Sequence, residues 1–238
     1  MIRTSFELGG SSVSVQLTKA ILLYSGSTGS AATVHEIGHD RTGPVILPGV
    51  GLGKAELHQI LLALLGSRSK VLFLPEKVLS ISPTQMAWWC QSQNREIYFK
   101  ARAEEDKVNK LSARKVQHPN LVFVATSGKL RVFALAKAGR PTPETKLYVA
   151  PYWNVFRDGQ MCQGDVKYPE GLLPQNIPAF EDAFFDSIFT HAEVNPLTYH
   201  PKGHTGFWAD LRSVKTIPAK WLVPCGKTLM EVLENAQA

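Results

Sequence analysis

Two short apolar segments, residues 121–125 and 130–135, give the clearest indication of how this chain folds. Both contain Val and Phe, residues that favour strands, and they flank Thr126-Ser-Gly-Lys129, a short polar turn sequence. A third segment of the same kind, residues 146–150, follows after a turn rich in Pro and Gly. This part of the chain therefore predicts a hairpin extended by a third strand.

The three predicted strands lead into a loop that carries a cysteine. Asn154 precedes Cys162 by eight residues, and Asp158-Gly159 between them favours a tight turn that brings the two together. A thiolate can carry an acyl group, and an amide donor can stabilise the oxyanion formed when a carbonyl is attacked. Asn154 and Cys162 are therefore candidate catalytic residues for thioester exchange, although by composition alone a Cys in such a loop is more often an inert, packed thiol.

A helix is predicted after this loop, because apolar residues recur at helical spacing between residues 179 and 189. Residues 227–237 predict a short surface helix at the end of the chain. In the N-terminal half, glycines bracket a run of helix-forming residues at 54–65. Strands are predicted there at residues 12–17, 20–24, 31–37, 70–74, 86–90 and 96–99.

The 238 residues, 44% of them hydrophobic, suffice for one large or two small domains. The charged, weakly patterned stretch between Arg102 and Lys115 is the expected boundary, which gives regions 1–110 and 111–238. The net charge is +6, but Lys and Arg are scattered, so nucleic-acid binding is not indicated. The composition favours an α+β protein over a coiled coil or a disordered chain.

The cysteine count is informative about the environment of the protein. Three cysteines without a CxxC pair argue against a disulfide scaffold and against a structural zinc site, and they fit a reducing cytosol. The first residues lack a basic segment followed by an apolar stretch, and the longest apolar run is too short to span a bilayer. We therefore expect a soluble, cytoplasmic protein.

The order of these features resembles the core of ubiquitin-conjugating enzymes. Members of that family carry His-Pro-Asn, with the Asn eight residues before the acceptor Cys, as Asn154 and Cys162 are here. Tyr152 and Trp153 stand where the family has His and Pro, and this departure predicts weaker support for Asn154. The triplet His118-Pro-Asn has the right letters, but no Cys follows eight residues on.

Within this group, the segment 147–169 is most similar to the bacterial PRTRC system protein B family, and the similarity extends over nearly the whole chain. The resemblance implies a ubiquitin-conjugating-like core in region 111–238, with an antiparallel meander sheet packed on helices. It also implies a family-specific α+β extension in region 1–110. Such proteins are encoded on plasmids and mobile elements.

The resemblance further implies an acyltransferase that accepts a ubiquitin-like protein as a thioester on Cys162, with Asn154 stabilising the oxyanion. His191 is the best candidate for handling protons near Cys162, and Asp165 or Glu193 is the candidate acid. No metal or cofactor is implied in this chain, since an activating partner would use ATP. The implied partners are a ubiquitin-like protein, an activating-enzyme-like adenylyltransferase, and JAB-type peptidase-like and ParB-like proteins of the same system; no membrane partner is implied.

Three alternatives remain at this point. The chain can be a non-catalytic interaction module of the same system, with Cys162 idle. Cys162 and His191 can form a hydrolase dyad. His35-Glu-Ile-Gly-His39 matches the H-E-x-x-H zinc motif, which requires a helix, although residues 31–37 read equally well as strand.

Overall fold

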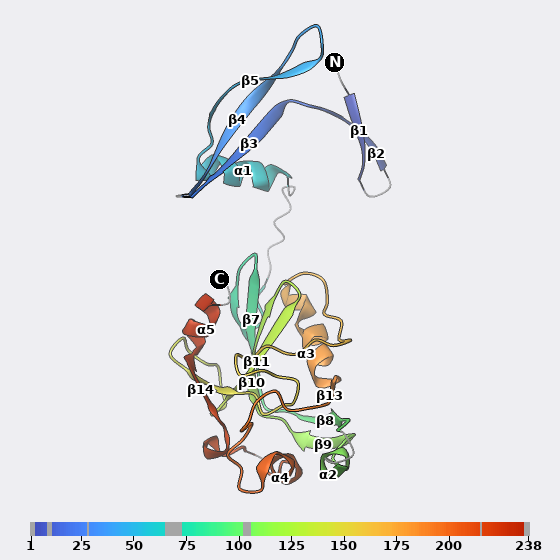
Figure 1. Cartoon of the computed structure of the whole chain (residues 1–238), viewed down its shortest axis with the longest axis vertical. Helices are drawn as coiled ribbons and strands as arrows, with labels where there is room; N and C mark the ends of the chain where they lie inside the picture. Colours follow the sequence, from blue (N-terminus) through green and yellow to red (C-terminus); the bar gives the residue numbers. More distant parts are fainter. Residues whose placement is uncertain are drawn as a thin grey trace. The chain divides into compact units, whose positions relative to one another are not determined.

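The computed structural model describes residues 3–8, 11–27, 29–64, 73–101, 106–214 and 216–235. The chain divides into two compact units, Met1–Leu72 and Phe73–Ala238 (Figure 1). Each unit has its own sheets, as expected for an α+β protein, and nearly all strand pairs are antiparallel. No helix in the described ranges is long and apolar enough to cross a membrane.

The first unit contains two antiparallel sheets and one helix. Strands β1 (Arg3–Leu8) and β2 (Ser11–Gln16) pair with each other. Strands β3 (Lys19–Gly26), β4 (Gly29–His39) and β5 (Pro44–Gly51) form a second sheet in that order, and α1 (Lys54–Leu64) follows. The strands predicted at 12–17, 20–24 and 31–37 and the helix predicted at 54–65 are confirmed, with small differences at their ends.

The second unit is built on a six-stranded antiparallel sheet with the order β14-β12-β11-β10-β7-β6. The predicted hairpin is confirmed as β10 and β11, in which Thr126 pairs with Lys129 across the turn. The strands of this sheet are β6 (Val78–Ile81), β7 (Gln85–Cys90), β10 (Asn120–Thr126), β11 (Lys129–Leu135), β12 (Lys146–Val149) and β14 (Pro224–Thr228).

The second unit also contains a three-stranded sheet, in which one pair of strands is parallel. Its order is β13-β8-β9, with β8 (Asn94–Phe99) antiparallel to β9 (Arg114–Gln117) and parallel to β13 (Ile188–Phe189). The helices of the unit are α2 (Asp106–Asn109), α3 (Ile177–Phe185), α4 (Gly203–Asp210) and α5 (Leu229–Asn235), with 3-10 turns at Pro174–Asn176 and Ala219–Trp221.

Both faces of the large sheet are covered, which explains why β7 and β10 read as continuous apolar runs. Trp88 and Phe123 stack at 5.2 Å on the face that packs against α3, while Trp89 and Val122 join the cluster that contains Val232 of α5. Helices α3 and α5 accordingly lie on opposite sides of the sheet (Figure 1).

The helix predicted at 179–189 is confirmed only in its first part. Helix α3 ends at Phe185, and Ile188 and Phe189 form β13 against β8. Ile188 is exposed and Phe189 is buried, an alternation that fits a strand as well as the apolar spacing fits a helix. The Ser187 hydroxyl donates to the Phe184 carbonyl and closes the last turn of the helix.

Other differences concern the middle of the chain. The compact units divide between residues 72 and 73, whereas the sequence predicted a division at 110, because β7 pairs with β10 across the charged stretch. Residues 70–72 of the strand predicted at 70–74 lie outside the described residues, and Phe73 and Leu74 are exposed and belong to no strand. Strand β6 was not predicted.

Candidate functional site

The loop between Asn154 and Cys162 folds back on itself as a narrow hairpin. The Cys162 N–H donates to the Asn154 carbonyl at 2.7 Å, and Phe156 and Gln160 are bonded across the loop at 2.9 Å. Gly159 occupies the tip with φ of 82°, a value that favours glycine. The turn predicted at Asp158-Gly159 is therefore confirmed, and it brings the backbones of Asn154 and Cys162 together.

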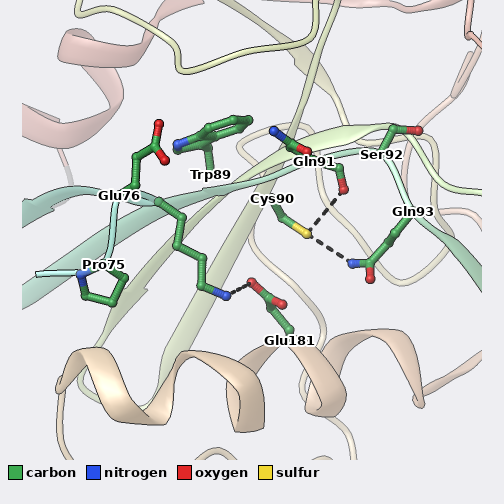
Figure 2. Close-up of a pocket in the computed structure, with 9 residues that line it drawn as sticks. Pro75, Glu76, Trp89, Cys90, Gln91, Ser92, Gln93 and Glu181 are labelled. Carbon is green, nitrogen blue, oxygen red and sulfur yellow. Dashed lines mark hydrogen bonds and ion pairs between the residues drawn. The ribbon is translucent and has the colours of Figure 1, made fainter.

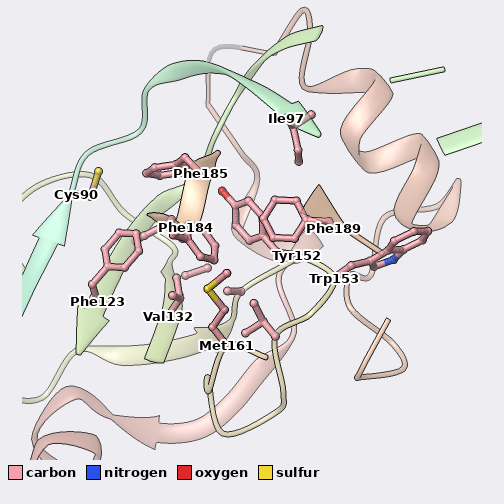
Figure 3. Packing of buried hydrophobic residues seen from close by; sticks show 14 of the residues in the cluster. Cys90, Ile97, Phe123, Val132, Tyr152, Trp153, Met161, Phe184, Phe185 and Phe189 are labelled. Carbon is pink, nitrogen blue, oxygen red and sulfur yellow. The ribbon is translucent and has the colours of Figure 1, made fainter. Parts of the chain in front are cut away.

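This hairpin is anchored on the edge of β11 and in the core. The Val132 N–H donates to the Gly159 carbonyl, and the Met161 N–H donates to the Leu130 carbonyl, both at 2.8 Å. The Met161 side chain is buried in the same cluster as Tyr152 and Phe184 (Figure 3). Cys162, the next residue, is partly exposed. A buried neighbour thus fixes the position of an accessible thiol.

Asn154 ties the hairpin to the segment that follows β13. Its backbone has φ of 56°, a left-handed conformation that Asn tolerates well. Its Nδ2 donates to the Ile188 carbonyl at 3.0 Å, and its Oδ1 accepts from both the N–H and the hydroxyl of Thr190 at 3.0 Å. Its own N–H donates to the His191 carbonyl at 2.9 Å. The Asn154 side chain therefore braces the loop.

The two residues that precede Asn154, Tyr152 and Trp153, are aromatic and buried in the core. Tyr152 is fully buried, and its hydroxyl is hydrogen bonded to Nδ1 of His118 at 2.8 Å. Trp153 stacks on His204 with ring centroids 5.3 Å apart. Burial lowers the pKa of both His118 and His204 to about 4, so both rings are neutral near pH 7. These contacts fix the two residues that precede Asn154.

His191 belongs to a chain of polar contacts that ends at Asn154. Its Nε2 lies 2.7 Å from a Glu193 carboxylate oxygen, and its Nδ1 lies 2.9 Å from the Thr190 hydroxyl. The His191 side chain is 63% exposed, whereas that of Glu193 is 17% exposed. Thr190 has one hydroxyl proton for two acceptors, the His191 ring and Asn154 Oδ1. A protonated His191 donates to Thr190 and leaves the Thr190 proton for Asn154.

Asp165 is placed differently from the other predicted residues. Asn154, Cys162 and His191 are linked through two backbone hydrogen bonds, in which Cys162 N–H meets Asn154 O and Asn154 N–H meets His191 O. Asp165 is exposed in the following turn, and it makes no hydrogen bond or ion pair within the described ranges. The structure thus groups three of the four predicted site residues.

Tyr168 lies six residues after Cys162, and the sequence did not indicate its surroundings. Its hydroxyl oxygen is buried without a hydrogen-bond partner among the described residues, and its ring lies 6.0 Å from that of Phe180. Burial, together with the negative charge of a Cys162 thiolate, raises the pKa of Tyr168 to about 12. Only the folded structure shows this, because it depends on what surrounds the hydroxyl.

Cys90 has surroundings that suppress thiol reactivity. It lines a pocket of about 530 Å³ in which Gln93 donates to its sulfur at 3.0 Å and the thiol donates to the Gln91 carbonyl (Figure 2). Burial raises the pKa of Cys90 to about 12. The Glu181 carboxylate beside it accepts from Lys77 and from the Trp88 indole. Cys90 therefore stays protonated at neutral pH.

The H-E-x-x-H sequence does not form a zinc site of the helical type. His35, Glu36 and His39 lie on β4, where a strand replaces the helix that the motif needs. Both ring nitrogens of His35 are engaged, with the Thr33 hydroxyl and the Leu47 carbonyl, each at 2.7 Å. Within the described ranges no three His, Cys, Asp or Glu side chains are grouped to hold a metal ion.

The hairpin, the hydrogen bonds of Asn154 and the partly exposed thiol define a thiol-bearing loop that packs on strand β11 of an α+β sheet domain. Residues 55–225 match the model of the family described as prokaryotic E2 family D. The chain therefore belongs to prokaryotic E2 family D, a family of ubiquitin-conjugating-like proteins. No curated protein and no solved structure matches the chain significantly.

Proposed function

We propose that the protein carries the C-terminal acyl group of a ubiquitin-like protein as a thioester on Cys162 and transfers it to an amine or a further carrier. The observation that carries this proposal is the hairpin that presents Cys162 partly exposed and hydrogen bonded to Asn154, in a chain of a ubiquitin-conjugating-like family. Exposure matters because the thiol must reach a bulky partner.

In the first step, the Cys162 thiolate attacks the activated carbonyl carbon of the ubiquitin-like protein. The new C–S bond forms as the bond to the activating enzyme's thiolate or to AMP breaks, and that group leaves with the electron pair. The ATP used for activation is consumed by the adenylating partner, so this chain needs no bound cofactor. The Cys162 proton passes to solvent or to a neighbouring base before attack.

In the second step, an amine attacks the thioester carbonyl. The C–N bond forms, the C–S bond breaks, and sulfur leaves as the Cys162 thiolate. Asn154 uses one Nδ2 hydrogen on the Ile188 carbonyl, so the other is available for the oxyanion. His191 takes the proton from the amine, and the Glu193 carboxylate stabilises the imidazolium.

Asp165 is the alternative proton acceptor in this scheme. It is exposed and close to Cys162 in sequence, whereas His191 is connected to Asn154 through Thr190. A comparison of His191→Gln with Asp165→Asn in the transfer step separates the two. We expect His191→Gln to slow transfer at least tenfold.

The partners follow from the proposed chemistry and from the resemblance to the PRTRC system protein B family. They are a ubiquitin-like protein and an activating-enzyme-like adenylyltransferase. JAB-type peptidase-like and ParB-like proteins of the same plasmid-borne system are further proposed partners, in a cytoplasmic setting.

A charging assay tests the proposal. The full-length protein is mixed with the adenylating partner, the ubiquitin-like protein and ATP, and the products are resolved on non-reducing gels. We expect an adduct that thiol reductant removes, that Cys162→Ala abolishes and that Cys225→Ser leaves intact. Cys225 is a matched control because it is also partly buried and unpaired.

The opposite result is equally informative. If the adenylating partner is active and the ubiquitin-like protein binds, yet Cys162 acquires no adduct, the protein is a non-catalytic interaction module. An adduct that survives Cys162→Ala would place the acceptor elsewhere and would also contradict the proposal.

A further inference from the structure

One edge of the β3-β4-β5 sheet in the first unit is open to a further strand. Strands β3 and β5 are the two edges of this sheet (Figure 1). Strand β5 contains Pro44 and Pro48, and proline protects an edge because it has no N–H to donate. Strand β3 is 8 residues long and contains no proline, and β4 is the one described strand that pairs with it. The free edge of β3 therefore lacks this protection.

The backbone groups of β3 alternate between β4 and the free edge. The Ile37 N–H donates to the Thr18 carbonyl at 3.2 Å, so the backbone groups of Thr18 point toward β4. In an antiparallel pair the N–H and C=O of one residue point to the same side, and the side changes at each residue. Residues 20, 22 and 24 therefore face β4. The residues whose N–H and C=O point to the free edge are Lys19, Ile21, Leu23 and Ser25.

The side chains along this edge are large, apolar and exposed. Leu23 is 76% exposed, and Ile21 and Leu22 are each 37% exposed. Lys19 is the one charged residue of β3, and its ammonium is already paired with the Glu36 carboxylate at 3.1 Å. A long apolar edge with unpaired backbone groups favours association with another strand.

We propose that the free edge of β3 pairs with β3 of a second copy of this chain, antiparallel about a two-fold axis at Leu22. In this register Ile21 lies opposite Leu23 of the second copy, and Lys19 lies opposite Ser25 of the second copy. The N–H and C=O groups that point to the free edge then find partners in both chains. The two sheets join into one continuous antiparallel sheet.

The occupant is a second copy because β3 is complementary to itself in this register. Leu22 meets Leu22 of the second copy, and the apolar side chains on either side of it meet each other. The two Lys19 residues lie at opposite ends of the paired strands, roughly 20 Å apart, which is beyond the screening length of about 8 Å. An interface of this two-fold kind closes on a dimer. It belongs to the first unit, so it is independent of the proposed thioester chemistry.

The mass of the full-length protein in solution tests the proposal, by light scattering and by sedimentation equilibrium over a range of concentrations. We expect twice the chain mass of 26.3 kDa for the wild type. Leu23→Pro removes an N–H that points to the free edge and leaves the bonds to β4 in place. The dissociation constant of the dimer should rise at least about tenfold in this variant.

Charge variants test the register without proline. Leu23→Lys places a charge opposite Ile21 of the second copy and should also weaken the dimer. Val50→Lys is the matched control, because Val50 is 69% exposed on β5 of the same sheet and should leave the dimer intact. Adding Ile21→Glu to Leu23→Lys places opposite charges face to face across the proposed axis, so the double variant should recover part of the lost affinity.

A wild type that is monomeric at about 100 µM overturns the proposal. A monomer in which the Ile21 and Leu23 amides exchange slowly with deuterium would show that the chain covers this edge itself, and it overturns the proposal as well. A dimer that survives both Leu23 variants places the interface elsewhere. No recovery in the double variant contradicts the register. Because none of these measurements involves Cys162, their outcome is distinct from that of the charging assay.

Discussion

Asn154 has more hydrogen bonds than an oxyanion donor needs. Its side chain holds Ile188 and Thr190, and its left-handed backbone accepts from Cys162. Most of its contribution is therefore to the shape of the loop, with one amide hydrogen left for chemistry. The eight-residue spacing in the sequence predicted the loop but not the brace, because Ile188 and Thr190 come from a distant segment. Tyr168 was missed because the burial of its hydroxyl depends on the residues that pack around it in the folded chain.

Replacing Asn154 by Asp should separate these two contributions. The carboxylate keeps the size and still accepts from Thr190, but it cannot donate to the Ile188 carbonyl or to an oxyanion. We expect a loss of about 1–3 kcal/mol in the free energy of unfolding and a transfer step slower by roughly 10–100-fold. Denaturant unfolding measures the change in stability, and single-turnover discharge of the thioester measures the rate of transfer.

Asn154→Gly is the companion variant, since glycine retains the left-handed backbone and loses every side-chain bond. Discharge at the wild-type rate in both variants would contradict a role for the Asn154 amide in transfer.

At the scale of elements, the hairpin that carries Cys162 depends on close packing against β11. A Cβ at Gly159 would lie 2.4 Å from the Phe133 ring, so only glycine fits there. The sequence indicated this turn because Asp-Gly is a strong local signal. It did not indicate the end of α3, because Ile188 and Phe189 satisfy helical and strand spacing alike and only the pairing with β8 decides.

Gly159→Ala should therefore cost more than an ordinary glycine replacement. The left-handed backbone alone costs about 1–2 kcal/mol, and the clash with Phe133 adds to it or displaces the loop. We expect a total loss of about 2–4 kcal/mol in unfolding free energy and slower charging of Cys162.

Gly128→Ala is the matched control, because Gly128 has φ of 73° but nothing within 4 Å of the added Cβ. Equal losses in the two variants, measured by denaturant unfolding, would show that the Phe133 contact is unimportant.

At the scale of the whole molecule, the second unit contains all the residues of the candidate site. The division between residues 72 and 73 could not be predicted from composition, since the charged stretch after Arg102 is no less linker-like in its letters. The boundary between the units is decided by long-range strand pairing. The pairing of β7 with β10 places residues from both sides of the charged stretch in one sheet. Short apolar runs bounded by turn residues predicted β7, β10, β11 and β12 themselves.

The second unit buries two neutral imidazoles, and this makes its stability depend on pH. Burial lowers the pKa of His118 and His204 from 6.5 to about 4. The unfolded chain therefore binds more protons than the folded chain between these values, and stability falls as the pH drops from about 6.5 to about 4. Each imidazole accounts for a loss of about 3 kcal/mol across this window.

Denaturant unfolding at several pH values between 7 and 4 checks this expectation. His118→Gln supplies an amide that can still bond to the Tyr152 hydroxyl but does not titrate. The free energy of unfolding of this variant should fall less steeply on acidification than that of the wild type. The loss that the two imidazoles cause together should be reduced by about half. Parallel curves for the two proteins would exclude His118 as a source of the acid sensitivity.

The bond between Tyr152 and His118 also has an evolutionary consequence. The phenol of Tyr152, two residues before Asn154, reaches an imidazole 34 residues earlier in the chain. Substitutions at the two positions should covary among relatives, because a lone phenol or a lone imidazole would be left buried without a partner. A search for the His-Pro-Asn triplet would overlook relatives that carry the Tyr-His pair instead. A search for the two positions of that pair together would find them.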